Sequence, residues 1–391
     1  HAGQPEATQG DHSQGSSACA EEFGTKVTLM AGSGSPHSRL TRLRTALPEA
    51  GADALIVSQP ENRAYLSGFT GSAGVLLISA DRTLIATDFR YFEQVGQECP
   101  DFELVPIEGD FSRVLPDLVA RGAARRVAFE SDHVAFATAR AWMDAVPDVE
   151  WLPTKGIVAG LRAIKDEYEI ATLRQAIALA DDALAFGLAS ARPGMTENEL
   201  AWLIESYMRT HGAQGTAFEM TVACGPNGAR PHAHAGETVL EAGQPIVIDM
   251  GARVHGYRSD LTRTIVLGQP KAPDLFWEIF NTVSRAQLAA EAALKPGMTA
   301  PEADSVARDL ISAAGYGANF GHGLGHGVGL EIHEQPFLSR FSSAIIQPGM
   351  MITVEPGVYL PGWGGVRMED IVMITEDGAE VLTGAPKHPI I

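Results

Sequence analysis

The chain has 391 residues, of which 45% are hydrophobic and 20% are charged, a balance typical of a water-soluble globular protein with room for two domains. Its formal net charge of -19 argues against nucleic acid or an anionic membrane as a partner, because phosphate groups would be repelled. No apolar run approaches the roughly 20 residues that span a bilayer. The cysteines Cys19, Cys99 and Cys224 are odd in number and widely spaced, which indicates neither a disulfide framework nor a thiolate metal site. A reducing cytoplasm is the predicted setting.

Residues 1–36 differ in composition from the rest of the chain. They are polar, rich in Gly, Ser and Gln, and without periodicity, and the segment 31–38 is typical of a flexible linker. The pattern of a secretory signal, a basic segment followed by an apolar one, is not found. We predict a flexible or non-native extension over 1–36, a first domain over 37–158 and a second over 159–391.

The region 37–158 alternates helical and extended patterns. Asp81 and Arg82 are turn residues between two apolar runs, which predicts a β-hairpin. The predicted elements are a helix within 38–51, a strand at 52–58, the hairpin strands 74–80 and 83–88, a helix over 90–98, a strand at 125–130 and a helix over 135–146. This pattern predicts a small α/β domain with no metal or nucleophile motif of its own.

A long amphipathic helix is predicted over 165–192, and an internal repeat follows it. Apolar residues recur there largely at helical spacing: Ile170, Leu173, Ile177, Ala180, Leu184 and Phe186. Residues 193–213 resemble 296–316, since in both a Pro-Gly-Met-Thr sequence leads into a helix with Thr196 or Thr299 as its N-cap. A second long helix, over 274–294, precedes the second copy. We therefore expect two helix–helix–sheet halves related by a pseudo-two-fold axis.

Asp249 ends a predicted buried strand, and Asp260 begins the next one. If the hairpin is symmetric about Val254 and His255, the two carboxylates face each other with Cβ atoms about 5 Å apart. Two anions at that distance repel strongly, so a bound cation would explain the pair. The plainer alternative is that Asp260 caps a turn and Asp249 merely ends a strand.

Two histidines, His322 and His326, lie in the glycine-rich segment 319–330. So many glycines argue against the helical arrangement of the H-E-x-x-H zinc motif, and they allow the backbone to approach a ligand or another segment closely. We expect a loop in which one histidine binds a metal while the other lines the pocket. A lone histidine is more often structural, but Glu331 and His333 follow closely and favour a functional role.

Two further acids lie in apolar surroundings. Glu355 follows the run 350–354, and Glu369 is expected inside an apolar strand within 364–374. A buried carboxylate without a partner is costly. Arg367 could neutralise one acid but not four. Four carboxylates and one imidazole without thiolate suit two divalent cations such as Mn²⁺, Co²⁺, Zn²⁺ or Fe²⁺, and two adjacent cations can activate a water molecule.

These motifs resemble the proline-specific metallopeptidases of the pita-bread fold, the group that holds aminopeptidase P, prolidase, methionine aminopeptidase and creatinase. The resemblance covers about 38–385 and includes F-T-G-S-A-G at 69–74 and T-D-F-R-Y at 87–91. It implies a creatinase-like N-terminal α/β domain followed by a pseudo-two-fold pita-bread α+β domain. It also implies a homodimer or a larger homo-oligomer.

The resemblance also implies a role for each candidate residue. A hydroxide that bridges two divalent ions, Mn²⁺ first among them, would attack the carbonyl carbon before proline. His232 and His333 would stabilise the oxyanion, and Glu355 would pass a proton to the leaving nitrogen. The metal ligands would be Asp249, Asp260, His326, Glu355 and Glu369, with Asp260 and Glu369 bridging, and the proline end of the pocket would be formed by His322, Tyr359 and Arg367. No role is expected for His234.

The implied substrates are peptides with proline in the second position. Prolidases often carry an Arg soon after H-E-x-P, whereas here Phe337 follows and the nearest Arg is Arg340. This departure favours an Xaa-Pro aminopeptidase over the alternative, an Xaa-Pro dipeptidase. Intact ligands count against a metal-free creatinase-like hydrolase using His232 as base, and against a non-enzymatic pita-bread binding module. The extra N-terminal domain counts against a methionine aminopeptidase.

Overall fold

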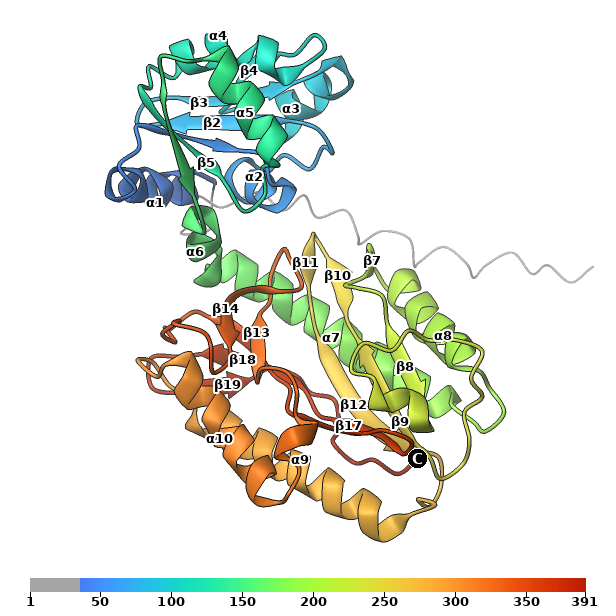
Figure 1. The fold of residues 1–391 in the computed structure, drawn as a ribbon. Coiled ribbons are helices and arrows are strands. Elements are labelled where there is room, and N and C mark those ends of the chain that lie inside the picture. The colour runs from blue at the N-terminus through green and yellow to red at the C-terminus, as the bar shows by residue number, and fades with distance from the viewer. Residues whose placement is uncertain (1–35) are drawn as a thin grey trace, which may run out of the picture.

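The computed structural model describes residues 36–391, which form two bodies joined by helix α6 (Ile157–Ala163) (Figure 1). The predicted extension over 1–36 therefore lies, apart from Pro36, outside the described residues. The first body is built on one mixed sheet, and the second carries the longest helices around several smaller sheets.

A six-stranded sheet in the order β4-β3-β2-β1-β5-β6 forms the centre of the first body. Strands β1, β2 and β3 pair antiparallel, and the outer pairs are parallel. Successive residues of β1 enter different hydrophobic clusters, because side chains alternate between the two faces of a strand. The strands are β1 (Ala54–Val57), β2 (Val75–Ser79), β3 (Thr83–Thr87), β4 (Glu103–Pro106), β5 (Arg126–Glu130) and β6 (Glu150–Thr154), and the helices are α1 (Pro36–Glu49), α2 (Pro60–Ser67), α3 (Phe92–Glu98), α4 (Leu115–Arg121) and α5 (Phe136–Ala145).

The elements predicted for this body are all present, within a few residues of their expected bounds. The hairpin turn lies at Asp81 and Arg82, where the Ser79 amide donates to the Arg82 carbonyl. The prediction did not include α2, α4, β4 and β6. Helix α2 begins at Pro60, and proline is pre-organised for the first turn of a helix. Pro60 could therefore have indicated where this helix starts.

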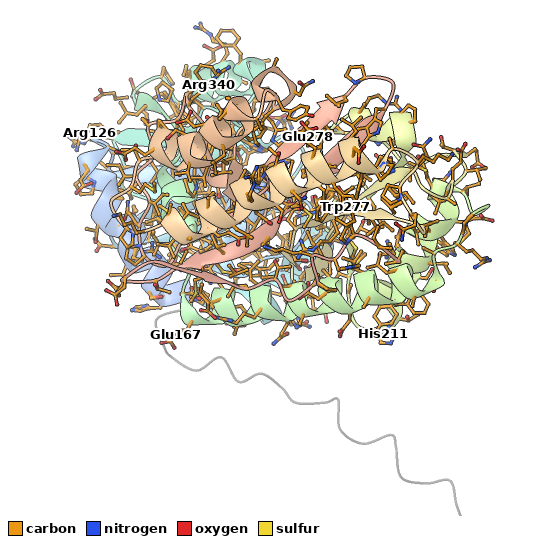
Figure 2. The ribbon with its side chains drawn as sticks, turned by 90° about the horizontal axis from the view of Figure 1, so that it is seen from below. Arg126, Glu167, His211, Trp277, Glu278 and Arg340 are labelled. Atoms are coloured by element: carbon orange, nitrogen blue, oxygen red, sulfur yellow. The ribbon has the colours of Figure 1, made fainter. Side chains whose placement is uncertain are left out.

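In the second body the helices lie outside and the strands inside (Figure 1). Seen from below, α7 begins near Glu167, and α9 carries Trp277 and Glu278 (Figure 2). The helices are α7 (Glu167–Ser190), α8 (Glu197–Thr210), α9 (Pro273–Ala293) and α10 (Ala300–Ala313). The strands are β7 (Gly215–Thr216), β8 (Thr221–Cys224), β9 (Pro245–Met250), β10 (Ala252–Val254), β11 (Tyr257–Arg258), β12 (Leu261–Val266), β13 (Gly325–Gly327), β14 (Glu334–Leu338), β15 (Met351–Val354), β16 (Gly357–Leu360), β17 (Gly364–Arg367), β18 (Asp370–Ile374) and β19 (Ala379–Val381).

The internal repeat predicted from the sequence is confirmed. Thr196 and Thr299 each begin their helix with a capping box, in which the threonine hydroxyl accepts from the amide of a glutamate three residues later. Each threonine also forms an isolated antiparallel bridge, Thr196 with Val239 and Thr299 with Ile345. The two halves thus share their caps as well as their helix order.

Each half has its own hydrophobic cluster, one between α7–α8 and strands β8, β9 and β12, the other between α9–α10 and strands β14 to β18. Most of the predicted apolar stripe of α7 is buried, but Phe186 is wrongly included because it is 40% exposed and stacks on Tyr207 of α8. None of the described helices is long and apolar enough to cross a membrane.

Candidate metal centre

The hairpin that carries the first two acids has a register different from the predicted one. Strand β9 pairs with β12 so that Asp249 lies opposite Thr262, and the turn residues are His255 and Gly256. Both have positive φ, 48° and 85°, as the tight two-residue hairpin turn requires. The centre of the hairpin, predicted at Val254 and His255, is therefore wrong by one residue. Asp260 lies two residues before Thr262, so both acids still face the same side of the sheet.

The remaining donors come from the second half of the repeat. His326 lies in strand β13 rather than in the expected loop. A Cβ on Gly325 would lie 2.0 Å from the Thr353 carbonyl oxygen, and a Cβ on Gly327 would lie 2.2 Å from that of Gln335. The glycines are therefore needed because β13 is pressed between β14 and β15.

Glu355 follows β15 directly, whereas Glu369 lies in the connection between β17 and β18 and not inside a strand as predicted. The backbone of Glu369 is tied to the first half, since its amide donates to the Thr262 carbonyl at 3.1 Å. The Thr262 hydroxyl donates to Glu369 Oε2 at 2.6 Å. These bonds hold the acid of the second half against the strand that follows Asp260.

The donor atoms converge. Ligand atoms of Asp260, His326 and Glu369 all lie within 4.8 Å of one another. His326 Nε2 is 3.3 Å from Glu355 Oε1 and 3.6 Å from Asp260 Oδ2. The other ring nitrogen, Nδ1, lies 3.1 Å from the Gly327 carbonyl oxygen, which can only accept. Metal-binding histidines are typically oriented by such a bond, which leaves Nε2 for the metal.

Asp249 lines the same cavity and forms an ion pair with Arg367. The Arg367 guanidinium also donates to the Tyr359 hydroxyl at 2.8 Å and to the Pro231 carbonyl at 3.2 Å. Arg367 thus pairs with one acid, as the sequence allowed, and within the described residues it forms no ion pair with the other three.

Burial governs the electrostatics of the cluster. It raises the pKa of Asp249, Asp260 and Glu369. Burial acts in the same direction on Glu355, but the hydrogen bond and charge of His326 prevail and lower the pKa of Glu355 to about 2. Within residues 36–391, two buried oxygens, Asp249 Oδ1 and Glu369 Oε1, have no hydrogen-bond partner.

This donor set fits divalent cations. A cluster whose carboxyl pKa values are raised binds protons unless another positive charge replaces them. Two of its carboxylate oxygens, without a hydrogen-bond partner among the described residues, are free to bind such a charge. Oxygen donors with one imidazole suit Mn²⁺, Co²⁺, Fe²⁺ or Zn²⁺.

The acids open into a cavity of about 580 Å³. The structure brings most of the other predicted site residues to it: the lining includes His232, His322, His333 and Arg367. Tyr359 lies behind the wall. It is buried, and its hydroxyl is 2.9 Å from His322 Nε2. Because His322 Nδ1 is 2.8 Å from the Gly323 carbonyl oxygen, a neutral His322 accepts from Tyr359, which in turn accepts from Arg367.

Several lining residues were not predicted, among them Phe218, Glu219 and Ile332. Glu219 Oε1 is 2.9 Å from Nδ1 of His234, a histidine to which no role was assigned, and both side chains are exposed. No spacing motif links these positions, although Ile332 is the neighbour of His333. Arg340 is exposed and stacks on Phe341, whereas Phe337 lines the cavity.

Comparisons with known proteins agree with this arrangement. Residues 171–376 match metallopeptidase family M24, and residues 39–164 match the creatinase/prolidase N-terminal domain. The chain belongs to family M24. It is therefore a metallopeptidase with a creatinase-type N-terminal domain and a pita-bread domain, as the resemblance implied, and membership of the family implies divalent metal ions.

Relatives within family M24 share the whole architecture. An Xaa-Pro dipeptidase of Pyrococcus furiosus is 35% identical over 88% of this chain and 97% of its own length. The solved structure of an Xaa-Pro dipeptidase from Bacillus anthracis superposes with a TM-score of 0.88 at 42% identity, over 91% of this chain and all of that one. An X-Pro aminopeptidase from Thermotoga maritima superposes with a TM-score of 0.82 at 38% identity, over 90% of this chain and all of that one.

Proposed function

We propose that the protein is an Xaa-Pro dipeptidase that hydrolyses the bond before proline with two divalent cations, Mn²⁺ first among them. The observation that carries this proposal is the convergence of four carboxylates and the Nε2 atom of one imidazole on a cavity flanked by further histidines. The relatives named as Xaa-Pro dipeptidases supply the substrate class. They favour the dipeptidase alternative over the aminopeptidase that the sequence favoured.

The cations would be held by Asp249, Asp260, His326, Glu355 and Glu369, and Asp260 and Glu369 would serve both ions. When bound, two such cations polarise the scissile carbonyl and lower the pKa of a water molecule. Asp249 could bind a cation through Oδ1, which has no hydrogen-bond partner among the described residues, while Oδ2 pairs with Arg367.

The other residues act on the peptide itself. The bond before proline is a tertiary amide, so it has no N–H for a strand-like docking site to recognise. A cleft walled by side chains avoids that difficulty. His232 and His333 on the cavity wall would donate to the oxygen of the tetrahedral intermediate. Glu355 would accept a proton from the attacking water molecule and deliver it to the leaving nitrogen.

The proline end of the cavity is proposed to lie at His322. The hydrogen bonds from Arg367 to Tyr359 and from Tyr359 to His322 fix that imidazole, so its position is set before a substrate arrives. Burial lowers the pKa of His322, which keeps the ring neutral near pH 7.

An Xaa-Pro aminopeptidase is the second candidate. Arg340 stacks on Phe341 and is not part of the cavity wall, and Phe337 occupies the lining instead. A wall without that arginine would tolerate a chain that continues beyond proline, and the Thermotoga maritima relative is named as an X-Pro aminopeptidase.

The deciding experiment compares hydrolysis of Ala-Pro and Ala-Pro-Ala by Mn²⁺-loaded protein, with a chelated sample as control. Faster cleavage of Ala-Pro supports the dipeptidase. Release of free Ala from the tripeptide, with the dipeptide a poor substrate, would replace it by the aminopeptidase. Absence of metal-dependent cleavage of both would contradict either peptidase and favour a binding module. Sedimentation of the same sample tests the proposed homodimer or larger assembly.

A further inference from the structure

The loop that carries His333 is held from outside the catalytic domain. It connects β13 to β14, and its residues Ile332 and His333 line the cavity. The His333 side chain is exposed, and its ring meets His326 edge-on with centroids 4.4 Å apart. The direction of His333 therefore depends on the backbone of residues 329–334.

Both neighbours of the Ile332–His333 pair are acids, and one arginine binds them both. Arg162 of the linker helix α6 donates through Nη1 to Glu331 Oε2 at 2.9 Å and through Nη2 to Glu334 Oε2. Lys165 Nζ donates to the other oxygen of Glu334 at 2.7 Å. Arg162, Lys165 and Glu334 are buried, so these charges are poorly screened.

Arg162 also connects this loop to the N-terminal domain. Its Nη1 donates to Asn62 Oδ1 of α2 at 2.8 Å, and Asn62 Nδ2 donates to Glu130 Oε1 of β5 at 2.6 Å. The second oxygen of Glu130 accepts from the amides of Ser58 and Gln59. The arginine is thus anchored to the sheet of the N-terminal domain.

Apolar packing joins the same two regions. Leu330, at the start of the loop, packs against the hydrophobic cluster of the N-terminal domain and against the small cluster around α7 and β18. The backbone of the loop is fixed from a third side, since the Arg258 amide donates to the Gly329 carbonyl at 2.8 Å and its guanidinium to the Leu330 carbonyl at 3.0 Å.

We propose that Arg162 is a positioning residue, through which the N-terminal domain sets the place of His333 in the cavity and thereby the rate of peptide hydrolysis. The inference takes its substrate from the proposed function, whereas the contacts of Arg162 do not depend on that function. Arg162 binds both Glu331 and Glu334. Its loss therefore loosens the backbone on either side of His333, although Lys165 still binds Glu334. A displacement of about 1 Å at a reacting group can lower a rate by about 100-fold.

The test is a double-mutant cycle between Arg162 and His333, measured as kcat for Ala-Pro with Mn²⁺. Arg162→Lys keeps the charge but cannot reach Glu331, Glu334 and Asn62 together. In the wild-type background we expect kcat to fall about tenfold or more with KM changed less than threefold. In the His333→Ala background the same change should lower kcat less than twofold, because the residue it positions is gone. Additive losses would overturn the proposal.

Hydrogen exchange gives a second readout that needs no activity. Amides of residues 329–334 should exchange faster in Arg162→Lys than in the wild type, with bound metal unchanged. The matched control is Arg39→Lys, which disturbs another buried interdomain arginine, bonded to Asp166 at 2.8 Å. This control should leave exchange in the loop unaltered. Unchanged exchange in Arg162→Lys, or equal exchange in both variants, contradicts the proposal.

A milder variant covers the case in which Arg162→Lys fails to fold. Glu331 is 35% exposed at its side chain, so Glu331→Gln removes one of the two ion pairs without burying a lone charge. It should show the same lack of additivity with His333→Ala. A wild-type protein that cleaves no Xaa-Pro substrate would contradict the proposed function, whereas the exchange result would still decide the positioning of the loop.

Discussion

The two halves of the pita-bread domain share a scaffold but contribute different chemistry. Each has a long helix, a capped second helix and a hydrophobic cluster against strands. The first half supplies Asp249 and Asp260 from one hairpin. The second supplies His326, Glu355 and Glu369 from three separate segments. The repeat therefore preserves what forms the framework, while the donor atoms depend on where each strand begins and ends.

Removing one donor from each half tests whether both are needed for one centre. Asp260→Ala and Glu369→Ala should each lower metal binding and reduce kcat/KM by about 1,000-fold or more, because each acid is proposed to hold both ions. Metal content by mass spectrometry and hydrolysis of Ala-Pro provide the measurements. A variant that keeps both ions and full activity would show that the centre belongs to one half alone.

The histidines of the cavity wall sharpen the same comparison, since His232 follows β8 of the first half and His333 precedes β14 of the second. His232→Ala and His333→Ala should each reduce kcat about 100-fold with little change in KM, as expected for donors that act on the transition state. Steady-state kinetics with His234→Ala as control check this. An effect confined to KM would indicate ground-state binding instead.

The first half also contains a buried acid, Glu169, that the N-terminal domain contacts. Burial, opposed in part by Arg39, raises the pKa of Glu169 from 4.5 to about 7. The folded state retains a proton that the unfolded chain releases, so this stabilisation is complete below about pH 4.5 and is lost as the pH rises through 7. Between pH 5 and pH 8 the wild type should lose about 2 kcal/mol of its free energy of unfolding through Glu169. The variant Glu169→Gln should not show this loss.

Urea unfolding at pH 5 and pH 8 measures that difference. The exposed neighbour Glu167→Gln is the matched control, since it lies in the same helical turn. If the pH dependence of Glu169→Gln equals that of the wild type, then Glu169 does not titrate in this range.

The smallest expected effect concerns the shared caps. Thr196→Ala and Thr299→Ala each remove one hydroxyl that accepts from a first-turn amide, and each should destabilise the fold by about 1 kcal/mol. Thermal unfolding of the two variants and of the double variant checks whether the halves are equivalent. A much larger loss for one threonine would show that the repeat is equivalent in geometry but not in stability.

The sequence alone predicted the framework well because its signals are local. The caps at Thr196 and Thr299 depend on a few neighbouring residues, and the metal donors lie in short motifs. The centre of the hairpin was missed by one residue, and its register therefore by two, although the His255–Gly256 pair was a readable turn signal. The exposure of Phe186 could not be foreseen, because it depends on the packing of α8 against α7.

The wall of the cavity was less accessible to prediction. Glu219 and Ile332 line the same cavity although they are more than 100 residues apart in the sequence, and no spacing rule relates them. The same holds for Arg162, whose partners Asn62 and Glu334 lie in different domains. Such contacts follow from the tertiary arrangement and from no local pattern.

The narrow space around β13 has a consequence for genetic variation. Gly325 and Gly327 have no functional group, but any side chain at either position would overlap a backbone carbonyl of a neighbouring strand. In a saturation library selected for growth on proline peptides, these two codons should be as intolerant of change as the codon for His326 between them. A variant-effect map would then show an apparent three-residue active site, of which only the middle residue carries chemistry.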